Sequence, residues 1–199
     1  MTNSNIKVAS ELLDLFHKLK KDDQWNHLST VDNTDLYSID LNNQCSIPCY
    51  MVKTNINKPQ EELINKIWLG TLESVKKYDN LIQSFEIIEK GDNWKIISMV
   101  NSLPWPLWPR QLVYYQTKII EGNTTYLISY SIDHDSIPYE TDLYVRAKVC
   151  FSVYEFIDNN DHTVVTRMTQ IDPCGNLPKL VIEMFSGKLV NMFNMWKHE

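Results

Sequence analysis

The sequence has few glycines, no catalytic signature motif and no excess of basic residues. Its five glycines are scattered, so no local glycine-rich run can form a phosphate-binding loop. The patterns GxGxxG, GxxxxGK[ST], GxSxG and HExxH are absent, which argues against the common nucleotide-binding, hydrolase and metalloprotease classes. With 19 basic against 25 acidic side chains, the net charge is −6. No nucleic-acid partner is expected, because such binding requires clustered basic residues that neutralise phosphates.

Cysteine usage and hydrophobic runs are also sparse. No CxxC pair occurs among the four cysteines, Cys45, Cys49, Cys150 and Cys174. This spacing favours buried, reduced thiols over a disulfide framework or a zinc site. No segment approaches the ~20 apolar residues of a membrane span, and residues 1–19 are interrupted by charges, unlike a secretory signal. We therefore expect a cytoplasmic protein with no metal and no cofactor.

Length and composition predict a single globular domain. A chain of 199 residues with 43% hydrophobic side chains can bury a large core, with room for an internal cavity, in one domain over residues 1–199. No internal repeat, low-complexity tract or linker divides the chain. A monomer is expected.

The spacing of apolar residues changes along the chain. Helical spacing predicts helices near residues 8–19 and 58–78, and alternation predicts strands near residues 25–31, 36–41 and 46–56. From residue 81 onward, alternating runs broken by short Gly and Asn turns predict six antiparallel strands. A last helix is predicted from one apolar face, made of Val181, Phe185, Leu189, Met192 and Trp196.

This order of elements predicts an α+β fold. A long antiparallel sheet has one face that must be covered, and a long helix with a continuous apolar face is a suitable cover. If the sheet curls around that helix without filling all the space, a cavity remains between them.

Residues 104–110, Pro-Trp-Pro-Leu-Trp-Pro-Arg, form an unusually apolar loop. Three prolines exclude a helix or an interior strand, while Trp105, Leu107 and Trp108 supply large apolar groups. Two interpretations remain open. The loop either folds over the protein's own core, or it covers a cavity and also touches a membrane surface, where Trp is favoured.

A second unusual segment, Asp-Pro-Cys-Gly-Asn-Leu-Pro-Lys at residues 172–179, leads into the last helix. Gly and Asn suit a turn, and Pro178 suits the first helical turn. On these residues alone the segment is a device for turning the chain and starting a helix.

The two segments in this order resemble the START family of lipid-transfer domains. The proline loop that ends at Arg110, the element Val145-Arg146-Ala147 and the segment at residues 172–179 all fit the family pattern. Tyr78-Asp79 stands where members commonly carry Trp-Asp. The resemblance covers residues 6–197, nearly the whole chain.

The resemblance implies a helix-grip fold, similar to START and Bet v 1 proteins, in which a curved antiparallel sheet of about nine strands wraps the C-terminal helix around a hydrophobic tunnel. The expected tunnel residues are Asp79, Ile97, Met99, Leu112, Tyr114, Gln116, Arg146 and Cys150. The loop at 102–110 and the C-terminal helix are expected to form a gate through Trp105, Leu107, Trp108, Arg110, Val181, Phe185, Leu189 and Met192. Arg110 and Arg146 are expected to pair with carboxylates or carbonyls near the tunnel mouth.

Departures from the family pattern bear on the ligand. Where phosphatidylcholine-carrying members have two aromatic residues that cage choline, this chain has Met99 and Leu112. Where cholesterol-carrying members have an acidic and a basic residue, it has Ile97 and Gln116. Asp79 matches a headgroup-contacting position of the phosphatidylcholine type, and its alternative is a solvent-exposed residue at a helix end.

The expected function is binding and transfer of one phospholipid, sterol or sphingolipid, with transient membrane contact and no chemical step. Two alternatives are an enzyme of the wider helix-grip superfamily, of the cyclase or hydratase type, and a lipid sensor without transfer activity. Catalysis would need an acid or base inside the tunnel, and the inferred lining offers only Tyr114 and Asp79 for that role.

Overall fold

A computed structural model describes residues 3–43, 45, 47–139 and 142–199. The elements, in chain order, are α1 (Asn3–Lys20), β1 (Asn26–Val31), β2 (Thr34–Ile39), β3 (Cys49–Ile56), α2 (Gln60–Trp68), α3 (Leu72–Tyr78), β4 (Ile82–Lys90), β5 (Trp94–Asn101), β6 (Arg110–Glu121), β7 (Thr124–Ser131), β8 (Val145–Arg146), β9 (Lys148–Asp158), β10 (Thr163–Asp172) and α4 (Lys179–His198). Residue 46, where the third strand was expected to begin, lies outside the described residues.

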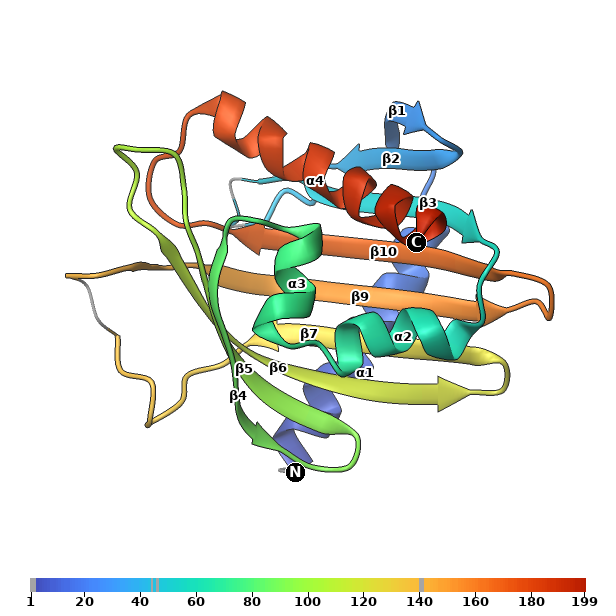
Figure 1. The fold of residues 1–199 in the computed structure, drawn as a ribbon, viewed down its shortest axis with the longest axis horizontal. Coiled ribbons are helices and arrows are strands. Elements are labelled where there is room, and N and C mark those ends of the chain that lie inside the picture. Colours follow the sequence, from blue (N-terminus) through green and yellow to red (C-terminus); the bar gives the residue numbers. More distant parts are fainter. Residues whose placement is uncertain (1–2, 44, 46, 140–141) are drawn as a thin grey trace.

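The described strands form one curved sheet (Figure 1). Its order is β1-β2-β3-β10-β9-β7-β6-β5-β4, and each neighbouring pair on this path is antiparallel. The two-residue β8 pairs in parallel with the start of β6 and lies off the path. The predicted antiparallel sheet of about nine strands is therefore confirmed.

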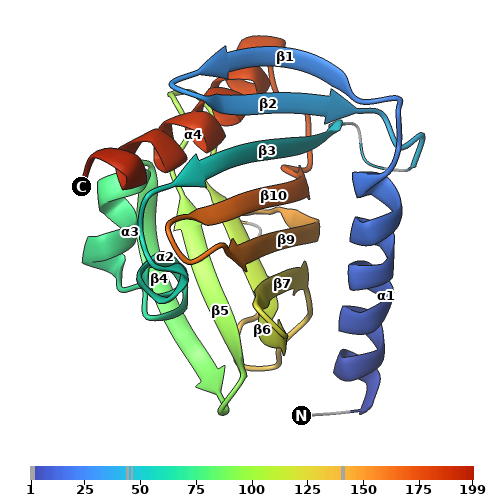
Figure 2. The same ribbon diagram turned by 90° about the vertical axis from the view of Figure 1, so that its right-hand side faces the viewer.

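Helices cover both faces of this sheet (Figure 2). On the convex face, α1 inserts Phe16 and Leu13 into a cluster with Met51 and Met168 from the neighbouring strands. Helices α2, α3 and α4 lie on the concave face, where the sheet curls around α4. This arrangement confirms the helix-grip fold that the sequence predicted.

The C-terminal half of α4 is anchored to the concave face. Phe193 and Trp196 are almost completely buried against Leu63 of α2 and Phe156 of β9. The rings of Phe193 and Trp196 meet edge to face, with centroids 5.1 Å apart. Full burial of a large apolar side chain contributes about 2 kcal/mol, so this half of the helix is firmly held.

The helix expected over residues 58–78 is two helices, α2 and α3. Gly70 lies in the break, and Thr71 begins α3 with a capping box: its side chain accepts from the Ser74 amide, and the Ser74 hydroxyl accepts from the Thr71 amide. The apolar spacing continues through the break, which explains why periodicity alone predicted a single helix.

None of the described helices combines the length and apolar character needed to cross a bilayer.

Candidate ligand-binding cavity

A cavity of about 300 Å³ lies between the concave face of the sheet and helices α2, α3 and α4. Its volume is at the lower end of the roughly 300–1,000 Å³ typical of small-molecule sites. Most of its wall is apolar, with side chains from β4, β5, β6 and the N-terminal half of α4. The anchored half of α4 closes one side, and the opposite half of the helix lies over the cavity.

Five of the expected tunnel residues line the cavity from β5 and β6: Ile97, Met99, Leu112, Tyr114 and Gln116. Ile97 is the register partner of Tyr114, and Met99 is the partner of Leu112, so these side chains share one face of the antiparallel pair. Asp79, which follows α3, also lines the cavity. That these residues contact a ligand stays a prediction.

Arg146 and Cys150 do not line this cavity. A β-bulge in β9 leaves Cys150 without a partner on β10, because Val149 pairs with Ile171 and the next pair is Phe151 with Gln170. Cys150 packs instead against the cluster under α1.

Arg146, the other expected tunnel residue that does not line the cavity, donates hydrogen bonds to the carbonyl oxygens of Ile137 (3.2 Å) and Pro138 (3.0 Å). Its expected pairing with carbonyls is present, but outside the cavity.

A polar row crosses the floor of the cavity. Gln116, Ser129, Ser152 and Thr169 are successive register partners on β6, β7, β9 and β10, and each is at least nine-tenths buried. Gln116 Nε2 donates to Ser129 Oγ at 3.0 Å. Gln116 Oε1 and Thr169 Oγ1 have no hydrogen-bond partner among the described residues. A buried oxygen without a partner costs free energy, so this row is suited to a polar group of a ligand.

Five charged side chains line the cavity: Lys66, Asp79, Arg110, Arg167 and Lys188. Lys188 of α4 forms an ion pair with Asp79. Lys66 forms an ion pair with Glu199 at 2.5 Å.

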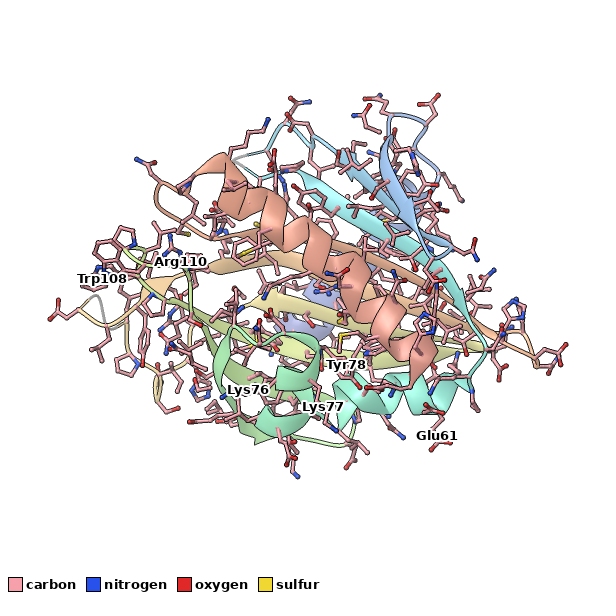
Figure 3. All side chains as sticks on the ribbon, turned by 45° about the horizontal axis from the view of Figure 1, so that its top comes forward. Glu61, Lys76, Lys77, Tyr78, Trp108 and Arg110 are labelled. Carbon is pink, nitrogen blue, oxygen red and sulfur yellow. The ribbon has the colours of Figure 1, made fainter. Side chains whose placement is uncertain are left out.

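Arg167 on β10 places its guanidinium carbon 4.6 Å from the ring centre of Tyr154. The lysines next to Asp79 in the sequence, Lys76 and Lys77, are exposed on the outer side of α3 and do not line the cavity (Figure 3).

Two buried phenols face this space. Burial raises the pKa of Tyr114 well above its ordinary value. Burial also raises the pKa of Tyr154, against the smaller opposing effect of the Arg167 charge. Both hydroxyls therefore stay protonated at neutral pH and can donate a hydrogen bond to a ligand.

The proline loop projects beside the cavity. Trp105 is 93% exposed and Trp108 is 51% exposed, while Leu107 is half-buried. A loop folded over the core would bury both Trp rings, so this interpretation is wrong for Trp105. Figure 3 shows Trp108 and Arg110 together at the end of the molecule from which the loop projects.

Arg110 joins the two expected parts of the gate. Its guanidinium donates to the carbonyl oxygens of Trp108 (2.7 Å), Pro173 (2.6 Å) and Cys174 (3.1 Å). The first belongs to the proline loop, and the other two belong to the turn before α4. Gly175 in that turn has a φ of 71°, a conformation that glycine adopts without steric cost.

Of the expected gate residues on α4, Phe185, Leu189 and Met192 line the cavity, and Ile182 stands there in place of Val181. Their gating role stays a prediction. The expected stripe began with two steps of four residues. An α-helix has 3.6 residues per turn, so steps of three and four alternate along one face, and that places Ile182 in the stripe.

Sequence reasoning missed Arg167, Tyr154 and the serine and threonine hydroxyls of the polar row. Their signal is strand alternation, since Arg167 and Thr169 are two residues apart on β10. That signal was ambiguous because helices cover both faces of the central strands, and apolar side chains such as Met168 therefore alternate with the cavity residues. Lys188 could have been found from its place beside Leu189 on the apolar face of α4.

A curved antiparallel sheet that grips a C-terminal helix around an apolar cavity defines a helix-grip protein with an internal cavity. The START domain pattern matches residues 7–199 of this chain. The chain belongs to the START domain family.

Individual relatives agree with this assignment. START domain-containing protein 10 of human and of mouse is 30% identical over 120 residues, which are 59% of this chain. The match spans 41% of the length of each of these relatives.

Solved structures show the same fold. Human StAR-related lipid transfer protein 5 superposes with a TM-score of 0.85 at 14% identity, over 100% of this chain and 97% of the other. The crystal structure of human STARD10 gives a TM-score of 0.77 at 20% identity, over 92% of this chain and 77% of the other.

Proposed function

We propose that this protein binds one lipid molecule in the cavity and transfers it between membranes. The observation that carries the proposal is the apolar cavity between the sheet and α4, closed on one side by the anchored half of that helix. Each methylene moved from water into such a cavity is stabilised by about 0.8 kcal/mol, so apolar walls can replace the interior of a bilayer as the surroundings of an acyl chain. The names of the structural relatives, which include a lipid transfer protein, support the same function.

Entry and exit are proposed to occur between the proline loop and the N-terminal half of α4. The exposed rings of Trp105 and Trp108 can enter the interface of a bilayer, where Trp is favoured. Leu180, at the start of α4, is 77% exposed and adds apolar surface to the same gate. Arg110 holds the loop to the turn before α4. A movement of the loop at the membrane would therefore also move the start of the helix.

The titratable groups of the cavity favour lipid binding and transfer without a chemical step. Tyr114 and Tyr154 hold their protons firmly, because burial raises the pKa of both, and Asp79 is engaged with Lys188. General acid–base catalysis needs a group that gains and loses a proton near the working pH. The lining described above supports a binding role better than a catalytic one.

The cytoplasm is the proposed compartment, with transient membrane contact and a single subunit as the working form. All four cysteines are free thiols, which fits a reducing environment. The net charge of −6 weakens attraction to anionic headgroups, and this favours release of the carrier after each contact.

Extraction of the purified protein with organic solvent, followed by mass spectrometry, tests the binding step. A lipid recovered at about one molecule per protein is the expected result. Transfer is tested with donor vesicles that carry a labelled lipid and acceptor vesicles that do not. A protein that yields no lipid and moves none between vesicles would contradict the proposal. Binding without transfer would support a sensor instead.

A further inference from the structure

Arg167 is a cation without a counter-ion in the cavity wall. Its Nε atom is buried, and its guanidinium makes no hydrogen bond or ion pair within the described part of the chain. The guanidinium lies over the ring of Tyr154, its register partner on β9. A ring face offsets only part of the cost of removing a cation from water. A negatively charged group placed here would therefore stabilise the guanidinium further.

The other charged groups of the cavity are ion-paired or hydrogen-bonded. Lys188 is paired with Asp79, and Lys66 is paired with Glu199. The Arg110 guanidinium is held by three backbone carbonyls. Both lysines are ion-paired and the donors of Arg110 are taken up by backbone carbonyls, so among the described cavity residues Arg167 is the cation whose guanidinium donors are free for a ligand.

The groups around Arg167 would support an oxyanion. Thr169 lies two residues further along β10 on the same face, and its hydroxyl has no hydrogen-bond partner among the described residues. The phenols of Tyr114 and Tyr154 remain protonated because burial raises the pKa of each. Hydroxyl donors and a guanidinium fork form the donor set that suits phosphate or carboxylate oxygens.

We propose that Arg167 makes the cavity selective for a lipid that carries an oxyanion, either a phosphate diester or a carboxylate, over neutral lipids. The negative oxygens bind the guanidinium and the neighbouring hydroxyls, and the acyl chains lie along the apolar wall from β5, β6 and α4. This inference rests on the proposed lipid-binding function and names the chemical class of lipid that the cavity takes.

The test uses vesicles that contain dioleoylphosphatidylglycerol, oleic acid and dioleoylglycerol in equal amounts in a zwitterionic matrix. The full chain is incubated with the vesicles and re-isolated, and its bound lipids are measured by mass spectrometry. Since all three lipids share one membrane, surface charge affects the protein's approach to each of them equally. The phosphatidylglycerol and the diacylglycerol have the same acyl chains and differ in the phosphate headgroup.

We expect at least about tenfold enrichment of one oxyanion lipid over dioleoylglycerol, as charge-assisted hydrogen bonds imply. Enrichment of phosphatidylglycerol identifies a phosphate as the source of the oxyanion, and enrichment of oleic acid identifies a carboxylate. In Arg167→Met the enrichment should fall to less than about twofold, while dioleoylglycerol still binds. Arg167→Lys keeps the charge but loses the planar fork, so an intermediate ratio is expected.

Lys53→Met is the matched control. Lys53 also lies over a tyrosine ring, that of Tyr37 at 5.6 Å, but it does not line the cavity. Its enrichment ratio should equal that of the unchanged protein.

Equal binding of dioleoylglycerol and both oxyanion lipids by the unchanged protein would overturn the inference while leaving lipid binding intact. Full enrichment in a folded Arg167→Met protein would overturn it as well. Failure to bind any lipid of the vesicles, including the phospholipid of the matrix, would count against the proposed function itself. If Arg167→Met does not fold, the ratio in the unchanged protein and in Arg167→Lys still decides the question.

Discussion

The carboxylate of Asp79, directly after α3, is paired with the ammonium group of Lys188 in the middle of α4. Both residues line the cavity, and both side chains keep about a quarter of their surface exposed. The pair joins the two helices on the concave side of the sheet. For Asp79, the structure therefore adds a contact that neither the headgroup interpretation nor the solvent-exposed interpretation included.

If α4 moves during lipid exchange, this ion pair opposes the movement. A partly exposed pair contributes up to about 1 kcal/mol, so its loss should raise the open population by up to roughly fivefold. Lys188→Met, which keeps the length of the side chain, is expected to accelerate vesicle-to-vesicle transfer by up to that factor. The control Lys7→Met breaks an exposed pair with Glu11 on α1, on the other face of the sheet, and should leave the rate unchanged. Slower transfer in Lys188→Met would show that Lys188 binds the ligand instead.

The exposed Trp rings of the proline loop should matter for membrane contact and little for folding. Trp105→Ala combined with Trp108→Ala is expected to slow transfer by about tenfold or more, because two Trp anchors are lost from the bilayer interface. The free energy of unfolding in urea should change by less than about 1 kcal/mol. Ile120 and Leu28 are exposed apolar residues outside the loop, so their double replacement by Ala is the control. Equal loss of stability and transfer would instead indicate a packing role for the loop.

Arg110 should be important for stability. Arg110→Met leaves three backbone carbonyls without their charged donor, and we expect a loss of about 3 kcal/mol in the free energy of unfolding. Urea denaturation at neutral pH measures this loss. Lys148→Met, on an exposed side chain of β9, should change stability by less than about 0.5 kcal/mol. A loss below about 1 kcal/mol in Arg110→Met would show that these three hydrogen bonds contribute little to stability.

The thiols of Cys49 and Cys45 should react slowly with alkylating agents. Burial raises the pKa of Cys49 to about 12 and the pKa of Cys45 to about 11, from an ordinary value of 9.0. Because the thiolate is the reactive form and a raised pKa reduces it, folded Cys49 at pH 8 has about a thousandfold less thiolate than an unshifted thiol. Its alkylation rate, followed by peptide mass spectrometry, should rise about tenfold per pH unit through pH 10. The same protein in urea, where all four thiols react rapidly, is the control; equal rates for Cys49 in both conditions would refute the shift.

Much of the fold could be predicted because local signals agreed with the final packing. Short turns with Gly or Asn separate strands that pair with their sequence neighbours, so β4 to β7 follow one another both along the chain and across the sheet. The long apolar face of α4 likewise has one place to pack. Where two signals competed, periodicity misled: the break at Gly70 and the Thr71 cap interrupt an apolar stripe that continues from α2 into α3.

The candidate site was predictable on β5 and β6 and less so elsewhere. Ile97, Met99, Leu112 and Tyr114 came from alternation together with a family resemblance, and they line the cavity. Cys150 could not be placed, because a bulge shifts the alternation of β9 by one residue and this irregularity has no clear sequence signal. The polar groups from β9 and β10 depend on the curvature of the sheet, which is a property of the assembled strands.

The sheet does not close on itself: β1 and β4 are its two edges and do not pair with each other. The interval between them is spanned by helices, with α4 in contact with β2 and β3 on one side and with α3 on the other. In a closed barrel, any increase in girth would break hydrogen bonds between strands. Between these two edges the described part of the molecule is held together by helix packing and not by pairing of strands. The width of the cavity can therefore change without loss of the hydrogen bonds between paired strands.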